Sequence, residues 1–218
     1  MAISLALLDS YGDIGVGSHG PEGIFLRDTR YLSGFDLRFE GQRPLLLGSV
    51  VEDDNASLSA NSSNPDIHLG DGLTIPRDII AMERTKLLFE AGCYERIGFF
   101  NYDDRQRSFC ITIRFEADFH DLFEIRGTRR KARGQRSACI VNPKRIELRY
   151  DGLDKIRRHT VMSFDPPPQR LGTSFAEFDV VLAPGEKYSI LVSTACGEDQ
   201  IPEPVHFLAE RGVEPRPE

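Results

Sequence analysis

The sequence lacks any long hydrophobic run. None of its 218 residues lies in an apolar stretch close to the roughly 20 residues that span a bilayer. The first segment, MAISLALLDSYGD, has neither the basic start nor the longer apolar core of a signal peptide, so we expect it to form a first strand. These absences predict a cytoplasmic protein without a membrane partner.

An excess of positive charge is also missing. The formal net charge is -7, with 27 Lys and Arg residues against 34 Asp and Glu residues. Proteins that bind nucleic acid favour basic surfaces, so the composition argues against nucleic acid as a partner. Glycines crowd residues 12–23, but they lack the spacing of a phosphate-binding loop and no βα unit follows. We therefore interpret them as tight turns rather than as a nucleotide site.

Cysteine is scarce, and the four cysteines are irregularly spaced. No Cys-x-x-Cys pair occurs, which argues against a zinc site, and no metal or organic cofactor is implied. A domain of this size does not need disulfides, so we expect reduced and mostly buried thiols. The cysteines are Cys93, Cys110, Cys139 and Cys196.

Strand-like alternation dominates what is present. In residues 108–117, Phe109, Ile111, Ile113 and Phe115 face one way and polar residues face the other, which predicts a half-buried antiparallel strand. No long amphipathic helix and no internal repeat is apparent. About eleven to fourteen short strands with frequent turn signals predict an all-β fold, an antiparallel β-sandwich of the supersandwich kind with little helix.

Turn signals suggest how these strands connect. The alternating residues 35–39, a turn at residues 40–42 and the apolar residues 45–47 predict a β-hairpin. A last hairpin is expected between residues 175–182 and 188–193. Residues 140–150 are expected to form one strand, and residues 118–127 an irregular crossover with one helical turn. The sandwich is expected to fill residues 1–197, and residues 198–218 to form a linker or tail.

Two charged segments stand out. Arg27, Asp28 and Arg30 cluster at the mouth of the first predicted hairpin, and on a strand Asp28 and Arg30 would share a face. Asp28 could fix one arginine and leave another guanidinium for a partner domain, or the cluster could be an internal ion-pair network that pins the first loop. The basic residues 128–136 are interpreted as a solvated hairpin tip, with an anion or partner contact as the alternative.

The acidic residues 118–124 invite a catalytic interpretation. Asp118, Asp121 and Glu124 could supply the two carboxylates of a glycosidase, and their three-residue spacing would align them on a helical turn. The simpler interpretation is a solvated acidic face, with Arg126 pairing with one carboxylate. His120 has no second histidine at ligand spacing, so packing is the simpler role for it.

Tryptophan, a common sugar-binding platform, is absent. Most phenylalanines fall in alternating strands and should be buried. Tyr31, Tyr94 and Tyr102 are the remaining exposed candidates for a glycan-binding module, although each is more simply a strand-edge residue.

Five short motifs occur together in the chain. They are GIFLRDTRYLS at residues 23–33, PLLL at 44–47, YER at 94–96, NY at 101–102 and ADFHDLFEIRG at 117–127. On these motifs, the chain resembles the N-terminal domain of bacterial glycogen debranching enzymes, which are amylo-α-1,6-glucosidase-like proteins. The resemblance covers about residues 10–197.

The resemblance implies a β-sandwich that precedes a catalytic (α/α)6 barrel, and the barrel supplies the acid and base. The sequence ends where that barrel would begin, so we expect a non-catalytic domain that docks and orients a barrel in cis or in trans. The alternative is a stand-alone module that binds α-glucan, and a weaker one is a sandwich that is itself a glycosidase. The candidate interface or glycan-proximal residues are Arg27, Asp28, Arg30, Tyr31, Asp118, Asp121, Glu124 and Arg126.

Overall fold

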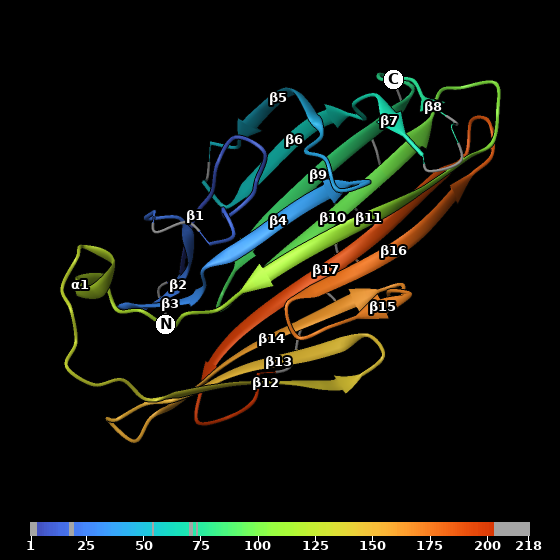
Figure 1. Ribbon diagram of the computed structural model, residues 1–218. Helices are drawn as coiled ribbons and strands as arrows, with labels where there is room; N and C mark the ends of the chain where they lie inside the picture. Colours follow the sequence, from blue (N-terminus) through green and yellow to red (C-terminus); the bar gives the residue numbers. More distant parts are fainter. Residues whose placement is uncertain (1–3, 18–19, 54, 70–71, 73, 203–218) are drawn as a thin grey trace.

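The computed structural model describes residues 4–17, 20–53, 55–69, 72 and 74–202 (Figure 1). Within them, all paired strands are antiparallel and the helix α1 (Leu122–Ile125) is a single turn. This helix is too short to cross a membrane, and no other described helix could do so. The predicted all-β sandwich is confirmed.

The larger sheet has eight strands in the order β12-β13-β14-β17-β10-β9-β6-β5. It includes the hairpin β9–β10. Its strands are β5 (Leu45–Val51), β6 (Ser57–Ser63), β9 (Ile80–Phe89), β10 (Gly92–Asn101), β12 (Gln135–Asn142), β13 (Arg145–Asp151), β14 (Arg157–Asp165) and β17 (Lys187–Glu198).

Three smaller sheets complete the fold. A four-stranded sheet has the order β15-β16-β11-β4 and lies across the larger sheet (Figure 1). Its strands are β4 (Gly34–Phe39), β11 (Arg107–Glu116), β15 (Arg170–Leu171) and β16 (Phe175–Leu182). A three-stranded sheet has the order β1-β2-β3, with β1 (Ser4–Leu7), β2 (Gly23–Leu26) and β3 (Thr29–Leu32). A two-stranded sheet pairs β7 (Ile67–His68) with β8 (Thr74–Ile75).

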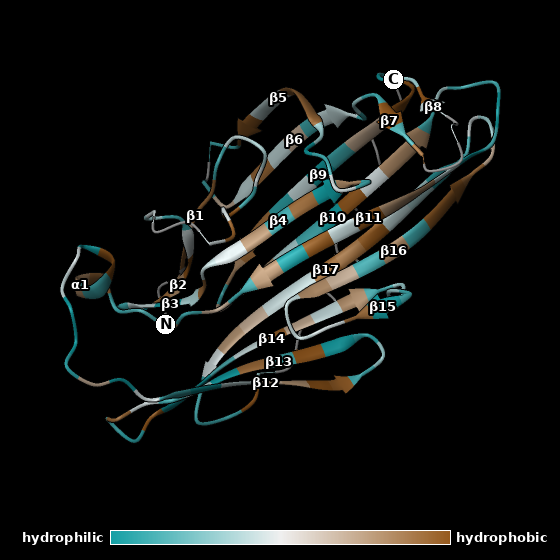
Figure 2. Cartoon of the chain, in the orientation of Figure 1, coloured by the Kyte–Doolittle hydropathy of each residue, from teal (hydrophilic) through white to brown (hydrophobic). Residues whose placement is uncertain are grey.

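Aromatic rings join the two main sheets. Phe39 of β4 stacks on Phe109 of β11, with ring centroids 4.3 Å apart, and meets Phe99 of β10 edge-on at 6.5 Å. Phe164 of β14 lies between Phe115 and Phe178 of the smaller sheet, with centroid distances of 6.2 and 6.0 Å. Hydrophobic and polar residues alternate along these strands (Figure 2). The inward face predicted for β11 is confirmed because its apolar residues are buried.

The two predicted hairpins, at residues 35–47 and 175–193, are wrong. In each, the two strands belong to different sheets. The turn after β4 exists, since the Phe39 amide donates to the Gln42 carbonyl oxygen at 2.8 Å. However, β4 pairs with β11 whereas β5 pairs with β6 in the larger sheet. Likewise, β16 pairs with β11 and β17 pairs with β10 and β14. A turn signal predicts a reversal of direction but does not say whether the next strand stays in the same sheet.

The segment after β11 also differs from expectation in part. The expected helical turn is α1, which is confirmed. Residues 128–136 are not a hairpin tip, because residues 128–134 lie in the connection from α1 to β12 and residues 135–136 begin β12. Residues 140–150 are divided between β12 and β13 by a turn that Asn142 stabilises, its side chain accepting from the Lys144 amide at 3.0 Å. Of the predicted tail, Glu198 still belongs to β17, and residues 203–218 lie outside the described residues.

The four cysteines are free thiols with different environments. Cys93 and Cys196 are buried, and burial raises the pKa of both thiols. Cys110 is half-buried, while Cys139 is exposed on the edge strand β12. Cys139 thus departs from the expectation of buried thiols because an edge strand has no neighbour on one side.

Candidate functional site

The fold brings together the charged residues 27–30 and the acidic segment of residues 118–124, both singled out in the sequence. The Arg30 amide donates to the His120 carbonyl oxygen at 2.9 Å, and the Leu122 amide donates to that of Asp28 at 3.1 Å. The β2–β3 turn therefore lies against α1. We call the surface formed by this turn, by residues 118–134 with α1, and by the adjoining loop residues 152–154 the α1 face.

Arg30 is the buried anchor of the α1 face, with only 3% of the residue exposed. Its guanidinium binds both carboxylate oxygens of Asp118, at 3.2 and 2.5 Å, and donates to the carbonyl oxygens of Gly20 and Glu22 at 2.8 and 2.9 Å. The predicted partner Asp28 lies instead in the exposed turn. A Cβ at Gly23 would lie 2.4 Å from Arg30 Cδ, so glycine is needed where this side chain passes.

Asp118 and His120 form the inner part of the same cluster. Burial opposes ionisation of Asp118, but hydrogen bonds and the charge of Arg30 outweigh it and lower the pKa of this carboxyl. His120 Nδ1 lies 3.2 Å from Asp118 Oδ2. Burial lowers the pKa of His120, with Asp118 opposing the shift. Asp118 is therefore held as a carboxylate next to Arg30.

The other two candidate carboxylates shape α1 itself. Asp121 is the N-cap and accepts from the amides of Phe123 and Glu124 at 2.8 and 2.9 Å, while Glu124 Oε2 accepts from the Asp121 amide at 3.1 Å. This is a capping box. Asp121 also pairs with Arg130, and Glu124 pairs with Arg133 at 3.1 Å. Arg130 and Arg133 both belong to the basic residues 128–136. That basic run was therefore the sequence feature that indicated the cations binding the carboxylates of α1.

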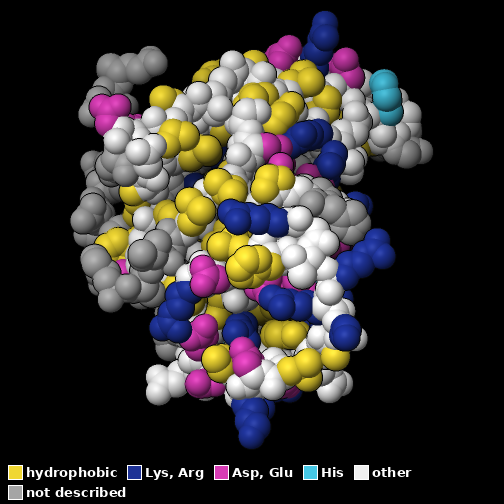
Figure 3. Space-filling model, turned by 90° about the vertical axis from the view of Figure 1, so that its left-hand side faces the viewer, with side chains coloured by type: hydrophobic (Ala, Val, Ile, Leu, Met, Phe, Trp, Pro, Cys, Tyr) yellow, Lys and Arg dark blue, Asp and Glu magenta, His cyan; other side chains and the backbone are white. Residues whose placement is uncertain are grey.

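The exposed part of the α1 face mixes charged and apolar groups. The Arg27 side chain is 66% exposed and pairs with Glu198. Phe123 is 63% exposed and Leu153, in the loop after β13, is 66% exposed, while Arg126 is exposed at the end of α1. The view toward this end shows Lys and Arg side chains interspersed with Asp, Glu and hydrophobic ones (Figure 3).

The tyrosine platform expected for a glycan module is wrong for two of its three members. Tyr31 is fully buried, with its ring centroid 5.7 Å from that of Phe119, and Tyr94 is only 5% exposed. Burial raises the pKa of Tyr31, and its hydroxyl donates to Glu198 at 3.3 Å. Tyr102 is 71% exposed.

Two hollows border the α1 face, and Phe119 and Arg133 line both. The larger, of about 670 Å³, opens between the end of β11 and the start of β12 and is also lined by His120 and Arg136. The smaller, of about 320 Å³, lies toward Leu153. Arg133 bridges them by donating to the carbonyl oxygens of Asp118 and Phe119 at 2.8 and 3.2 Å.

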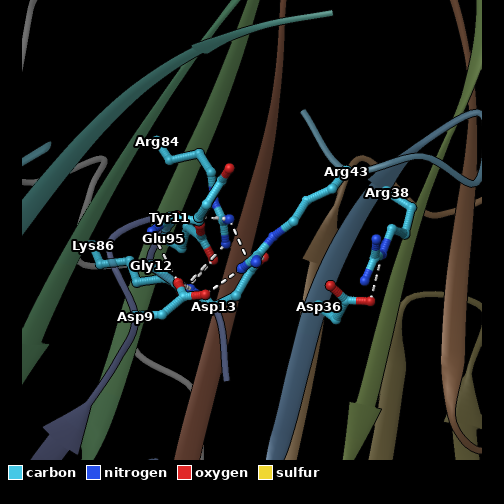
Figure 4. Close-up of polar contacts among 10 residues, drawn as sticks. All are labelled: Asp9, Tyr11, Gly12, Asp13, Asp36, Arg38, Arg43, Arg84, Lys86 and Glu95. Carbon is cyan, nitrogen blue, oxygen red and sulfur yellow. Dashed lines mark hydrogen bonds and ion pairs between the residues drawn. The ribbon is translucent and has the colours of Figure 1, made fainter. Parts of the chain in front are cut away.

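A second ionic cluster, centred on Arg84, was not predicted (Figure 4). Arg84 Nε donates to Glu95 at 2.6 Å and Nη1 donates to Asp13 at 2.6 Å, while Lys86 lies 2.5 Å from Glu95. All four are buried. Arg84 and Lys86 fall at alternating positions of β9 that resemble a solvated face. They are buried because residues 11–13 of the first loop cover them, the carbonyl of Tyr11 accepting from Arg84 at 2.9 Å.

The two carboxylates that bind Arg84 shift in opposite directions. Burial raises the pKa of Asp13, because Arg84 and the other nearby cations compensate only in part. Burial acts in the same direction on Glu95, but Arg84 and Lys86 outweigh it and lower the pKa of that carboxyl. Glu95 is therefore the carboxyl of the cluster that is harder to protonate, and Asp13 is the one that is easier to protonate.

Residues 2–193 match the sequence profile of the N-terminal domain of (some) glycogen debranching enzymes. The chain belongs to this family. No curated protein matches it by sequence. The family consists of N-terminal domains of larger enzymes. The family assignment confirms the resemblance found in the sequence.

Solved structures share the fold of this debranching-enzyme domain. A protein described as a kojibiose phosphorylase from the human microbiome has a TM-score of 0.55 at 10% identity, and the match covers 90% of this chain but 26% of that one. The Slr1438 protein from Synechocystis sp. PCC 6803 has a TM-score of 0.50 at 12% identity, covering 90% of this chain and 96% of that one. The chain thus spans about a quarter of the first protein and nearly all of the second.

Proposed function

We propose that this chain is a non-catalytic domain that docks on and orients the (α/α)6 catalytic barrel of an amylo-α-1,6-glucosidase-like glycoside hydrolase. The barrel is joined in cis or supplied in trans, the glycan it acts on is an α-glucan, and the protein is cytoplasmic. The observation that carries the proposal is the α1 face of a domain belonging to a debranching-enzyme family. Phe123 and Leu153 are exposed there among charged side chains. Large apolar side chains surrounded by polar ones are typical of a surface that binds another protein.

The state of the carboxylates supports a non-catalytic role. Glycosidases use two carboxyl groups, and the one that acts as general acid needs a raised pKa. Here the pKa values of Asp118 and Asp121 are both lowered, by Arg30 and by backbone amides with Arg130 respectively, in each case against the opposing effect of burial. Glu124 is bound by Arg133 and closes the capping box. These contacts give all three carboxylates a structural role, and the lowered pKa values of Asp118 and Asp121 support a non-catalytic role for those two.

The docking surface can be tested with a catalytic domain from a family member, produced as a separate chain. Isothermal titration calorimetry would measure its affinity for this domain, and the same mixture would be assayed for release of glucose from α-1,6 branches. Phe123→Asp places a charge in the proposed contact, and we expect it to weaken binding at least tenfold, about 1.4 kcal/mol. Val181→Asp is the matched control, because Val181 is a comparably exposed apolar residue on β16. Equal affinities for the two variants would contradict the proposal.

A stand-alone glycan-binding module is the second candidate. It is favoured by the structural match that extends over 96% of the Synechocystis chain, a solved protein of similar extent. Affinity electrophoresis in gels containing glycogen separates the candidates. Retardation of this chain alone, together with no affinity for a catalytic domain, would favour the module over the docking role.

A further inference from the structure

A third hollow, away from the α1 face, lies where the first loop meets the outer side of β4 and β11. Its volume is about 400 Å³. Charged side chains of both signs form most of its lining, and we call it the Asp13 hollow. The charged residues are Asp9, Asp13, Glu22, Asp36, Arg38, Arg43 and Arg114.

One carboxylate oxygen in this hollow has no hydrogen bond. Asp13 is 1% exposed, and its Oδ1 accepts from Arg84 at 2.6 Å. Its Oδ2 is buried without a hydrogen-bond partner among the described residues and lies 3.5 Å from Arg43 Nη2 on the side of the hollow. A buried carboxylate oxygen without a hydrogen bond is costly, so this oxygen needs the nearby positive charge of Arg43, which keeps that guanidinium at the hollow. The raised pKa of Asp13 agrees with that need.

Ion pairs hold the rim of the hollow in fixed orientations. Arg38 Nε donates to Asp36 at 2.7 Å, and Arg43 pairs with Asp9 while its guanidinium lies 3.8 Å from the centre of the Tyr11 ring. Figure 4 shows Arg43 reaching toward Asp9, with the Arg38–Asp36 pair beside it. The guanidinium and carboxylate groups at the rim are therefore already ordered before a ligand binds, which lowers the entropic cost of binding.

The balance of charge indicates the chemical class of the ligand. Four carboxylates face three guanidinium groups in the hollow, and Arg84 lies beneath Asp13. A phosphate would meet the carboxylates, and a cation would meet the arginines, so neither is favoured. Sugar hydroxyls both donate and accept hydrogen bonds. We infer that the Asp13 hollow binds a sugar residue of a glycan, with sugar hydroxyls donating to Asp36 and accepting from Arg38 and Arg43 at its rim.

This inference does not rest on the docking role. Among the described residues, the hollow meets the α1 face only where the carbonyls of Gly20 and Glu22 accept from Arg30. The test is an amide ¹H–¹⁵N NMR titration of the full chain with maltotriose, a probe chosen because the family contains glycogen debranching enzymes. Shifts should be confined to residues around the hollow, such as Gly15 and Asp36. Maltotriose would be added to about 10 mM, tenfold above a Kd of 1 mM.

Arg38→Gln is the informative variant, because it changes the rim and leaves the Asp13–Arg84 contact intact. We expect it to weaken maltotriose binding about tenfold or more. Arg170→Gln is the matched control, since Arg170 is also a strand arginine paired with one carboxylate, that of Glu177, and lies outside the hollow. The control should bind like the unaltered chain.

Three results would overturn the inference. The first is no shift around the hollow at the highest maltotriose concentration. The second is equal affinity of the Arg38→Gln variant and the unaltered chain. The third is that inorganic phosphate shifts the same amides with higher affinity than maltotriose, which would make the hollow an anion site.

Discussion

The clusters around Arg84 and Arg30 use the same chemistry in different surroundings. Each arginine is buried, and each ties an early loop to a later part of the chain. Around Arg84, the side chains of Asp13, Glu95 and Lys86 are at most 7% exposed. Around Arg30, exposure rises from 15% for Asp118 to 45% for Arg130. The first cluster is enclosed within the domain, whereas the second reaches from the interior to a surface that a partner can contact.

The comparison is tested most severely by removing Arg84. Arg84→Met keeps a long apolar side chain but leaves Asp13 and Glu95 facing each other without their shared cation. Breaking a buried ion pair in this way costs about 3–5 kcal/mol. Urea unfolding followed by circular dichroism should show a loss of that size. A loss below about 1 kcal/mol would mean that the cluster is hydrated and not enclosed.

The corresponding change in the second cluster should cost less. Arg30→Met removes the hydrogen bonds to Asp118, Gly20 and Glu22, but Asp118 is near enough to solvent to be rehydrated. We expect a loss of about 2 kcal/mol, within the range for losing hydrogen bonds to a charged group. The same urea experiment ranks the two variants. A larger loss for Arg30→Met than for Arg84→Met would reverse the comparison.

Each cluster contains one carboxylate, Glu95 or Asp118, through which acid should destabilise the folded state. The pKa values of Glu95 and Asp118 are lowered in the folded state, so each carboxylate contributes stability above its unfolded pKa of about 4. That stability is lost as pH falls through the folded values. Asp13 has a raised pKa, so its protonation favours the folded state as pH falls. Side-chain carboxyl ¹³C NMR should find that Asp13 titrates at higher pH than Glu95, and the opposite order would refute this assignment.

The smallest expected effect is at the helix of the α1 face. Asp121→Ala removes the N-cap of α1 and should cost about 1 kcal/mol or less. Because α1 is a single exposed turn, hydrogen exchange should accelerate at the amides of Phe123 and Glu124 with little change in β9 and β10. Faster exchange throughout the larger sheet would show that α1 is part of the domain core.

The sequence was sufficient for elements that depend on local pattern. Alternation alone located β11 and its buried face, because a strand between solvent and core has a period of two. Turn residues placed the reversal after β4 but could not assign β5 to the larger sheet. That assignment depends on long-range pairing with β6 and on packing across the sandwich.

The candidate site was predictable only in part, for a related reason. The resemblance singled out the residues around Arg30 and Asp118, but their contact depends on the meeting of β3 with the segment after β11. Arg84 went unnoticed because a charged residue in an alternating strand indicates a solvated face. Its burial depends on residues 11–13, which have no pattern that predicts where the first loop packs.

The most direct test of a docking α1 face is hydrogen exchange of this chain with and without a family catalytic domain. We predict slower exchange in residues 119–133 on binding, and unchanged exchange around Arg84, which is already enclosed. Protection confined to another surface, or no protection with saturating catalytic domain, would contradict the assignment of the α1 face as the docking surface.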